Sequence, residues 1–528
     1  MASMEMTEVA RDGHVDRQSQ DEAVQDSPQS EISTRRLALL LGSLWFGALL
    51  VALDETMIAT IAVPIATSLD AFSSFSWIST TYVIGSAVSQ SLSGHLTDIV
   101  GRRKGIVVCY SCFAIGTLLC GLATNLGMFL TGRILQGMGG GGLSTIVAFV
   151  ESDLIPMNRR ALIEGIGNAC YGVMLALGGV YGAGVYSQIG WKWAFLIQIP
   201  IMVIDAAIIY FTVRISDEKR IKLANTKVDF IGMFTLTSSL VLFQYGLSTG
   251  SVSTTWATPG VILPVCLALP LLGFFVYWET HRAANPVFPI RSILGRSVGS
   301  INLSAFLSTG AYTSCLFYIS VYLEIGGLSS LDLSLRLVPM AILFGVSSII
   351  AGHAVCKLRR YWHLNIGLGI VSVVSYALLS SLGTRSPSWQ PFFYLALLGI
   401  GFGGSFVTNL MGVLTSIPAD QQAVVQSAQW ASRSLGIAVS LTVSSVIFQS
   451  ISMENLERRV PNDSSVSGLA DVSFLGNGSL SGLDMQTRTQ VESSYQSGIS
   501  AVFYYLLAQS ALGTAVSFLI KNERLKLD

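Results

Sequence analysis

The sequence predicts an all-α polytopic membrane protein, and three observations lead to that fold class. Of the 528 residues, 51% are hydrophobic and only 12% are charged, whereas soluble proteins carry about 25% charged residues. Apolar runs of about 20 residues, long enough to cross a bilayer as a helix, recur along almost the whole chain. Strand-like alternation is absent. Because backbone groups inside lipid must be bonded internally, a bundle of helices is expected rather than a barrel.

Fourteen apolar segments are expected to span the membrane, and the first begins directly after Arg35 and Arg36. It is too long for the core of a signal peptide, so no cleavable signal is predicted. The segments lie at residues 37–60, 77–97, 106–124, 127–150, 162–187, 193–213, 229–248, 258–278, 299–323, 333–352, 363–383, 391–416, 424–449 and 499–520.

These segments divide the chain into six expected parts. The polar loop 450–498 is rich in serine and glycine, and its N-x-S sequons at Asn462 and Asn477 are predicted glycosylation sites. The parts are a disordered acidic cytosolic tail (1–36), an N-terminal six-helix half (37–214), a linker with two extra helices (215–278), the first five helices of the C-terminal half (279–449), an outer-side polar loop (450–498), and the last helix with a short cytosolic tail (499–528).

Basic residues in the loops predict the orientation. If the first segment enters from the cytosol, the even-to-odd loops are cytosolic, and the cytosolic loops of membrane proteins are enriched in lysine and arginine. The short opposite loops offer Lys192, Arg336 and Arg385. The even-to-odd loops hold Arg102, Arg103, Lys104, Arg159, Arg160, Arg214, Lys219, Arg220, Lys222, Lys227, Arg282, Arg291, Arg296, Lys357, Arg359 and Arg360. Both termini are therefore expected in the cytosol.

Composition also argues against several classes of protein. Basic and acidic residues number 31 each, so bulk positive charge is not available to bind a nucleic acid. The seven cysteines lie in apolar stretches and indicate neither a disulfide framework nor a metal site. No Gly-Lys-Ser/Thr follows the glycine runs, so no nucleotide is expected. No His-Glu-x-x-His motif or intramembrane histidine cluster is visible, which disfavours an enzyme.

Two sequence echoes indicate duplicated halves. Residues 94–104 read GHLTDIVGRRK, and residues 352–360, GHAVCKLRR, form a weaker copy. QGMGG at residues 136–140 is echoed by LGIGFG at residues 398–403. Two six-helix halves related in this way are typical of a transporter whose site lies between them. The seventh and eighth segments would then be an insert between the halves.

Four motifs resemble signatures of the major facilitator superfamily. Residues 94–104 are similar to G-x-L-x-D-R-x-G-R-[RK]-K, with Ile99 where the family has an arginine. Residues 133–139 are similar to R-x-x-Q-G-x-G. Residues 53–64 resemble L-D-x-T-I-x-x-x-A-x-P of the fourteen-span drug:H⁺ antiporters, and residues 190–200 resemble the turn between their fifth and sixth spans.

The resemblance implies a major facilitator fold and a transport activity. The chain would export a drug, toxin or secondary metabolite by proton-coupled alternating access. Residues 160–168 also look like fungal vacuolar transporters of basic amino acids, which makes proton-coupled transport of basic amino acids at the vacuole the alternative. Val180 replaces a proline that accompanies export in the family, so both directions stay open. A nutrient sensor with the same fold is a further alternative, disfavoured by the intact Asp54 and Arg133.

Charges inside the predicted helices mark the expected proton-coupling site. Asp54 lies within the first segment, where a bare charge costs several kcal/mol; it should therefore face a cavity or a partner and exchange protons. Glu55 points about 100° away around the same helix. Arg133 shares a helical face with Gln136 and stays protonated, and the resemblance implies that it takes part in proton coupling. Purely structural roles for Asp54 and Arg133 are the alternatives.

A gating latch is expected at the cytosolic end of the second segment. An acid within a basic cluster, flanked by glycines, would join helices differently in the inward-open and outward-open states. The resemblance favours this role over ordinary anchoring by positive charge. The latch residues are Gly94, Asp98, Gly101, Arg102, Arg103 and Lys104.

The expected partners are a small-molecule substrate, protons and the lipid bilayer. Gln136, Tyr171, Gln429 and Arg433 are candidates for lining the substrate cavity, with helix packing as the alternative for each. No cofactor, metal, nucleotide or nucleic acid is expected, because a proton gradient would supply the energy. The protein is expected to act as a monomer in the plasma membrane, with the vacuolar membrane as the alternative.

Overall fold

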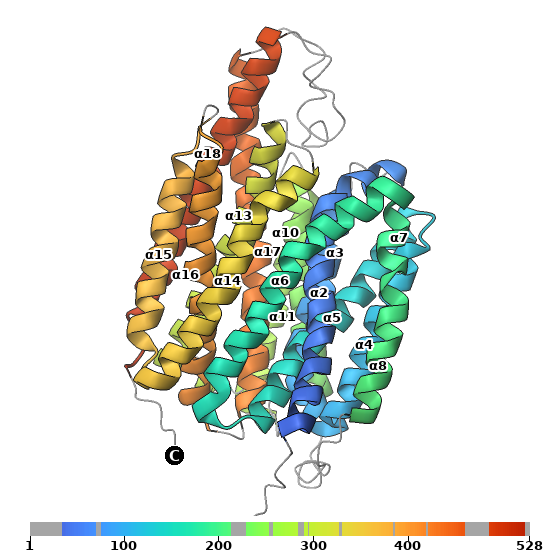
Figure 1. Cartoon of the computed structure of the whole chain (residues 1–528), viewed down its shortest axis with the longest axis vertical. Helices are drawn as coiled ribbons and strands as arrows, with labels where there is room; N and C mark the ends of the chain where they lie inside the picture. The colour runs from blue at the N-terminus through green and yellow to red at the C-terminus, as the bar shows by residue number, and fades with distance from the viewer. Residues whose placement is uncertain are drawn as a thin grey trace, which may run out of the picture. The chain divides into compact units, whose positions relative to one another are not determined.

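Long helices follow the predicted membrane segments in the computed structural model (Figure 1). The structure describes residues 34–69, 75–212, 229–252, 257–283, 290–293, 295–326, 330–383, 386–418, 421–459 and 485–522. The helices are α2 (Thr34–Ser68), α3 (Phe75–Val100), α4 (Arg102–Gly121), α5 (Leu126–Leu154), α6 (Met157–Ile189), α7 (Trp191–Leu196), α8 (Gln198–Thr212), α10 (Phe230–Val252), α11 (Pro259–His281), α12 (Ile290–Ile293), α13 (Arg296–Ile325), α14 (Ser330–Leu358), α15 (Trp362–Ser380), α16 (Trp389–Thr415), α17 (Gln422–Arg459) and α18 (Met485–Ser517).

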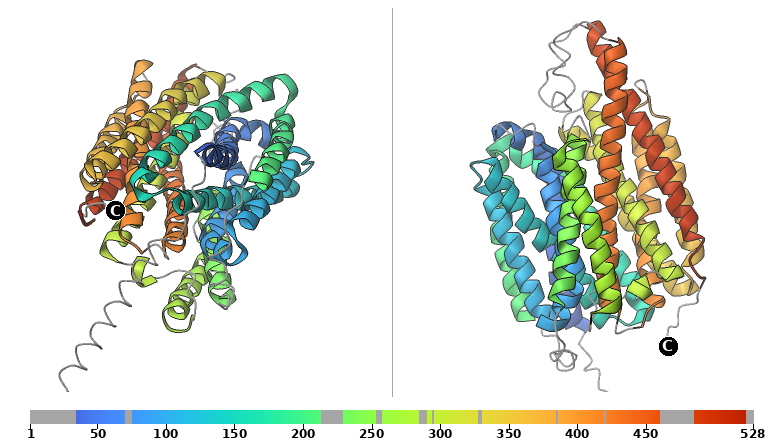
Figure 2. Two further views of the ribbon diagram at one scale, coloured as in Figure 1. Left: turned by 60° about the horizontal axis from the view of Figure 1, so that its bottom comes forward. Right: turned by 180° about the vertical axis from the view of Figure 1, so that it is seen from behind.

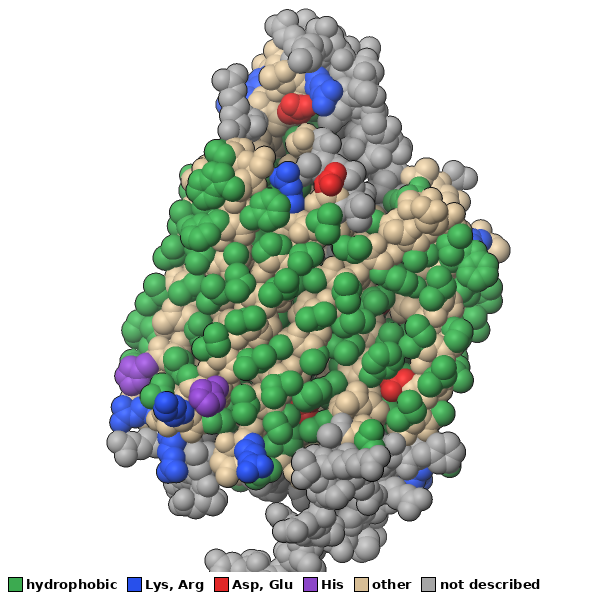
Figure 3. Space-filling view, viewed as in Figure 1, with side chains coloured by type: hydrophobic (Ala, Val, Ile, Leu, Met, Phe, Trp, Pro, Cys, Tyr) green, Lys and Arg blue, Asp and Glu red, His purple; other side chains and the backbone are tan. Residues whose placement is uncertain are grey.

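The chain forms two units, Met1–Gly42 and Ser43–Asp528, and their boundary falls inside α2. The second unit contains α3 and every later helix. One face of it has a continuous hydrophobic surface in the middle, with lysine and arginine side chains toward both ends and histidine side chains toward the lower end (Figure 3). This distribution fits a bundle that crosses a bilayer. The predicted glycosylation sites Asn462 and Asn477 lie outside the described residues.

Within the described residues, 12 helices are long and apolar enough to cross a membrane. The other two predicted segments, 77–97 and 127–150, form α3 and α5, which are long helices but do not meet the same hydropathy criterion. The reason is their position: α5 packs against both α3 and α4 and buries Arg133, Gln136 and a run of glycines instead of facing lipid. The all-helical fold is thus confirmed, and the count of fourteen spans stays a prediction.

The echo between residues 94–104 and 352–360 extends to the backbone. Gly101 joins α3 to α4 with a φ of 97°, and Arg359 joins α14 to α15 with a φ of 53°. Each lies seven residues after the glycine that opens its copy, Gly94 or Gly352. A left-handed residue in the same place of both copies marks α3–α4 and α14–α15 as equivalent pairs, although only the first copy places a glycine there.

Small residues bring the two halves together along α6 and α14. A Cβ atom added to Gly165 on α6 would lie 2.5 Å from the carbonyl oxygen of Ser348, and one added to Gly345 on α14 would lie 2.7 Å from the Cα atom of Ala169. Backbones that approach this closely are typical of small-residue helix interfaces in membranes. On another side of the same unit, α3 packs against α17 and joins the halves a second time.

The two extra helices α10 and α11 lie side by side on the back of the bundle (Figure 2). α10 contacts both α3 and α17, so it touches one helix of each half. α11 packs on α10 and has a mean hydropathy of 2.3. Only 17% of its most apolar stretch is buried inside the protein. The insert therefore adds a lipid-facing pair without entering the centre of the bundle.

The predicted loop 450–498 is partly helical, which corrects its boundaries. α17 continues to Arg459, and α18 begins at Met485. The rings of Phe448 and Tyr495 stack with centroids 5.9 Å apart, so the two helices pair along apolar side chains. The high serine content of this stretch concealed that apolar spacing.

Candidate functional site

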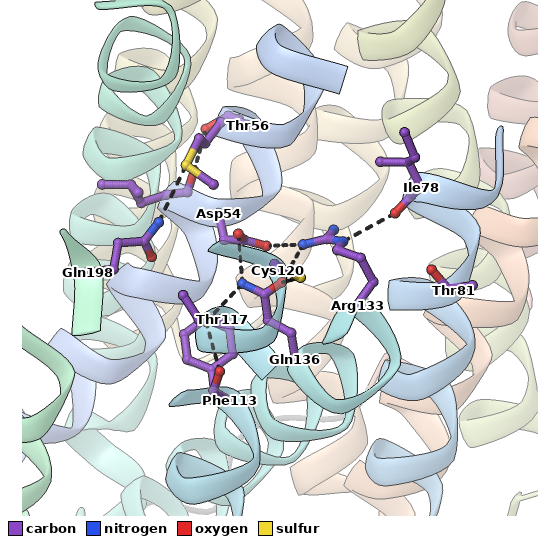
Figure 4. Close-up of polar contacts among 12 residues, drawn as sticks. Asp54, Thr56, Ile78, Thr81, Phe113, Thr117, Cys120, Arg133, Gln136 and Gln198 are labelled. Carbon is purple, nitrogen blue, oxygen red and sulfur yellow. Dashed lines mark hydrogen bonds and ion pairs between the residues drawn. The ribbon is translucent and has the colours of Figure 1, made fainter. Parts of the chain in front are cut away.

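A buried ion pair between Asp54 and Arg133 lies in the centre of the first half (Figure 4). Arg133 Nη1 donates to Asp54 Oδ2 at 2.7 Å, and the two side chains are 1% and 0% exposed for Arg133 and Asp54, respectively. Gln136 donates from Nε2 to the other carboxylate oxygen of Asp54 at 2.9 Å and accepts from Arg133 Nη1 at 2.7 Å. Asp54 and Arg133, two of the residues expected at the proton-coupling site, thus form one closed network with Gln136, which was expected to line the substrate cavity.

Two further helices hold this network in place. On α3, the carbonyl oxygen of Ile78 accepts from Arg133 Nε at 3.2 Å, and the Tyr82 ring lies 4.5 Å from the guanidinium carbon. On α4, Thr117 accepts from Gln136 Nε2 at 3.1 Å. Charges out of water are tolerated when geometry and hydrogen bonds compensate the lost hydration. Asp54 therefore links α2 to α3, α4 and α5 through Arg133 and Gln136.

Glu55 lies on a different face of α2 from Asp54. Its side chain is exposed, and its Oε2 atom accepts a hydrogen bond from the hydroxyl of Tyr171 on α6 at 2.8 Å. Tyr171 in turn packs against the hydrophobic core of the second half. The pair Glu55–Tyr171 is therefore placed where the halves meet, which is the region where repeat-built transporters bind substrate.

The predicted latch residues make contacts of two kinds. The backbone N–H of Gly94 donates to Ser427 Oγ of α17 at 2.9 Å, which joins the two halves. Arg102 Nε forms an ion pair with Asp153 on α5 at 3.3 Å, inside the first half. Ion pairs this accessible are weak.

The remaining latch residues follow Gly101. Arg103 donates to the carbonyl oxygen of Tyr210 at 2.5 Å and stacks on its ring at 4.5 Å. Lys104 is exposed, and the side chain of Asp98 lies outside the described residues. Gly94 thus contacts the opposite half, and the arginines tie α4 to α5 and α8.

Sequence reasoning missed a second set of contacts between the halves at the same end. Arg160 on α6 donates from Nη1 to Gln422 Oε1 at 3.3 Å, and Gln426 Nε2 donates to Ser152 Oγ of α5 at 2.9 Å. Both glutamines belong to α17. The positive-inside rule alone accounts for Arg160 in the sequence, so its contact with the other half was not expected. Gln422 and Gln426, two polar residues at the start of a long apolar helix, were the signal that could have indicated this contact.

Two buried carboxylates were also missed. Glu151 accepts a hydrogen bond from the indole nitrogen of Trp45, and Glu164 on α6 lies near Glu151. Asn168 Nδ2 donates to Glu164 Oε1 at 3.5 Å. Both acids are buried, and their position near the ends of predicted segments hid them from a search for charges inside the spans.

The four predicted cavity residues separate into three places. Gln136 belongs to the Asp54 network, and Tyr171 holds Glu55. Gln429 and Arg433 lie on α17 in the second half and are 1% and 4% exposed. Neither amide atom of Gln429 has a hydrogen-bond partner in the part of the chain that the structure describes. These residues therefore do not form one continuous surface in this conformation.

Comparison with known proteins identifies relatives among fungal transporters. The chain is 28% identical to multidrug resistance protein fnx1 of Schizosaccharomyces pombe, over 82% of this chain and 83% of fnx1. It is 28% identical to the vacuolar membrane amino acid uptake transporter fnx2 of the same organism, over 80% and 73%. It is 27% identical to the efflux pump dotC of Dothistroma septosporum, over 81% and 74%.

Solved structures share the fold, and a family model matches most of the chain. The fold is similar to that of the proton:xylose symporter XylE, with a TM-score of 0.61 at 13% identity over 91% of this chain and 95% of that one. It is also similar to a bacterial homolog of the human lysosomal transporter Spinster, with a TM-score of 0.60 at 15% identity over 92% and 98%. These likenesses show the fold. The sequence model of the Major Facilitator Superfamily matches residues 44–441. The chain is thus a membrane transporter rather than an enzyme, and it belongs to the Major Facilitator Superfamily.

Proposed function

We propose that the protein is a proton-coupled secondary active transporter that exports a small organic molecule, such as a drug, toxin or secondary metabolite, by alternating access. The observation that carries the proposal is the buried network of Asp54, Arg133 and Gln136. An ionisable residue inside a membrane span is a functional site by default when its partner can be named. Relatives named as an efflux pump and a multidrug resistance protein support the export of such molecules.

Protonation of Asp54 would change the packing of the first half. The carboxylate accepts from both Arg133 and Gln136, so a proton on Asp54 removes one acceptor and leaves the arginine charge uncompensated. Arg133 also holds Ile78 and Tyr82 of α3, the helix that reaches α17 in the other half. Protonation of Asp54 would therefore change the packing between the two halves, because α3 contacts both Arg133 and α17.

Glu55 would act at the substrate side of the same helix. Its exposed carboxylate and the Tyr171 hydroxyl lie where α2 and α6 face the second half. Substrate and proton would thus bind adjacent residues of α2, Glu55 and Asp54, without sharing a site. Any effect of substrate binding at Glu55 on proton binding at Asp54 would be transmitted through the backbone of α2.

The hydrogen bonds at the lower end would hold the transporter closed on the proposed cytosolic side. Arg160–Gln422, Gln426–Ser152 and Gly94–Ser427 all join the halves there. Such bonds can be exchanged during rocking at small cost, because the net contribution is about 1 kcal/mol for each of the two neutral bonds and about 1.5–3 kcal/mol for the bond from the charged Arg160. The predicted orientation, with both termini cytosolic, places this end inside the cell, and we retain fourteen spans with α3 and α5 as interior members.

Vacuolar transport of basic amino acids is the second candidate. The specific observation that favours it is the similarity to fnx2, a vacuolar membrane amino acid uptake transporter. In this case the membrane would be vacuolar. The transported molecule would carry an α-ammonium group and a second cationic group, either the ammonium of lysine or the guanidinium of arginine. A deletion strain whose vacuolar lysine and arginine pools fall, while its sensitivity to toxins is unchanged, would establish this alternative over export from the cell.

Reconstitution tests proton coupling directly. The full-length protein is placed in proteoliposomes with an imposed pH gradient, and fluorescein, rhodamine 6G and radiolabelled L-lysine serve as probes. The wild type is expected to move at least one probe faster when the gradient is present. Asp54→Asn should remove that dependence while a cooperative thermal unfolding transition is kept.

The matched control is Asp229→Asn. Asp229 accepts hydrogen bonds from Trp278 Nε1 and the Gly232 N–H beside the inserted helices, and asparagine can still accept there. Gradient dependence should persist in this variant. Retained gradient dependence in Asp54→Asn would contradict the coupling role.

A further inference from the structure

Arg433 on α17 is a buried arginine with no bound acid. It is 4% exposed, its Nε atom has no hydrogen-bond partner, and no hydrogen bond or ion pair reaches its guanidinium from the residues that the structure describes. Glu164 on α6 is the acidic residue whose charge acts on it, yet the two groups form no ion pair. A buried charge is normally paired. Arg133 in the first half, with its carboxylate partner at 2.7 Å, shows what full pairing looks like in the same protein.

Aromatic rings support the Arg433 guanidinium from its flat faces. The Phe406 ring centroid lies 3.8 Å from the guanidinium carbon, and the Trp430 ring lies 5.1 Å from it. Stacking of this kind fixes the plane of the group and leaves its N–H edges available. Those edges match the two oxygens of a carboxylate in a bidentate arrangement. The geometry is therefore that of a held donor rather than of a structural anchor whose donors are consumed by the backbone.

A narrow space lies beside the guanidinium, between α13, α16 and α17. In this conformation it is too small to hold a water molecule. A bound group would therefore enter only when the side chains or helices around it move apart. Its lining includes Ser308 and Thr309 of α13, Phe402, Phe406 and Asn409 of α16, and Arg433.

Asn409 adds a second polar group to this space. It is 4% exposed and lines the same space. Its Nδ2 group is the donor that an oxyanion would use, because the Oδ1 atom only accepts hydrogen bonds. The wall beyond it is aromatic, because Phe402 stacks on Tyr312 with ring centroids 4.1 Å apart. The space thus combines one cation, one neutral amide and flat apolar rings.

We propose that Arg433, with Asn409, forms a subsite that binds the carboxylate or other oxyanion group of an apolar, aromatic substrate. The inference rests on the proposed transport function and narrows its substrate class. No acidic side chain of the described residues forms an ion pair with Arg433, so the anion would provide the missing negative charge. Binding would then replace an unpaired buried charge with a bidentate ion pair. A molecule presenting only positive charge would be repelled here, and an amino acid could use the subsite only through its carboxylate.

Binding to the full-length protein in lipid nanodiscs tests the subsite without any proton gradient. The probes are 1-naphthaleneacetate and 1-naphthaleneacetamide, which share shape and differ in charge, and 1-naphthylmethylammonium as the cation. The wild type should bind the carboxylate at least tenfold more tightly than the amide or the ammonium ion. Arg433→Gln should reduce the preference for the carboxylate to less than threefold. Arg433→Lys should leave an intermediate preference, because an ammonium keeps the charge and loses the planar fork.

The matched control is Arg336→Gln. Arg336 stacks on Phe392 at 5.4 Å but does not line the space, so its loss should leave the carboxylate preference unchanged. Asn409→Leu provides a second variant that tests the subsite if Arg433→Gln fails to fold, and it should weaken carboxylate binding several-fold. Equal binding of carboxylate and amide to the wild type, or a full preference in Arg433→Gln, would overturn the proposal. Because no gradient is used, a failure of Asp54-dependent coupling would leave this result unaffected.

Discussion

Arg359 occupies in the second half the left-handed backbone position that Gly101 occupies in the first. Their φ angles are 53° and 97°, and each residue separates the second helix of a half from the third. A residue with a Cβ atom costs roughly 1–2 kcal/mol in this conformation. The two halves thus place a positive-φ residue at the same position, and in the second half that residue is basic and lies at the proposed cytosolic surface.

Replacing the strained arginine should raise stability. Arg359→Gly removes the Cβ clash, so the unfolding free energy in detergent should rise by a few tenths to about 1 kcal/mol after the added chain entropy is deducted. Thermal unfolding followed by intrinsic fluorescence measures the change. Arg360→Gly next to it has no positive φ and should give no gain, and a stabilised Arg360→Gly would contradict the explanation. Gly101→Ala should destabilise by about 1 kcal/mol.

The ion pair of Asp54 and Arg133 should behave as one energetic unit. Breaking a buried pair by removing one partner costs about 3–5 kcal/mol because the remaining charge is left uncompensated. Asp54→Ala and Arg133→Ala should therefore each lower the unfolding temperature strongly. The double variant should lose clearly less than the two single losses added together. Additive losses in this double-mutant cycle would show that the two side chains are not coupled.

Two glycines of α6 should respond oppositely to the same substitution. Alanine favours a helix by about 1 kcal/mol over glycine, and a Cβ atom on Gly184 meets nothing within 4 Å. Gly184→Ala should therefore stabilise or leave stability unchanged. Gly165→Ala places its Cβ atom 2.5 Å from the carbonyl oxygen of Ser348, so it should push α6 from α14, lower the unfolding temperature and slow transport of any probe. Equal effects of the two variants would argue against the close seam.

A reversible cross-link should lock the lower end. Ser152 and Gln426 hydrogen-bond across the halves at 2.9 Å, so Ser152→Cys with Gln426→Cys, on a background without the native cysteines, should be joined by a short bis-methanethiosulfonate reagent. Transport should stop when the cross-link forms and return when it is reduced. The matched single-cysteine variants should keep transporting after the same treatment. A cross-linked protein that transports at the normal rate would show that this end need not open.

Much of the fold was predictable because lipid imposes a simple pattern on the sequence. Apolar length located the helices, and the motif around residues 94–104 correctly indicated the family. The exceptions are instructive. α3 and α5 carry polar and glycine residues because they face other helices. The ends of α17 and α18 extend beyond the predicted spans because they pair with each other, a contact that needs knowledge of both helices at once.

The site was predictable where a charge lay deep inside a span. Asp54 and Arg133 were expected at one proton-coupling site, and the structure pairs their side chains. Gln136 was expected to line the substrate cavity, but its amide hydrogen-bonds to Asp54 and Arg133 instead. The spacing of residues along one helix could not show this contact with another helix. Glu151 and Glu164 were missed because each lies within a turn or two of a helix end, where carboxylates are common.

The inserted helices restrict where a molecule could pass between the bilayer and the interior. α10 lies against both α3 and α17, so it covers the seam between the halves on its side, whereas α6 and α14 close their own seam by the direct approach of their backbones. The two seams are therefore separated from the lipid by different means, one by an added helix and the other by close packing.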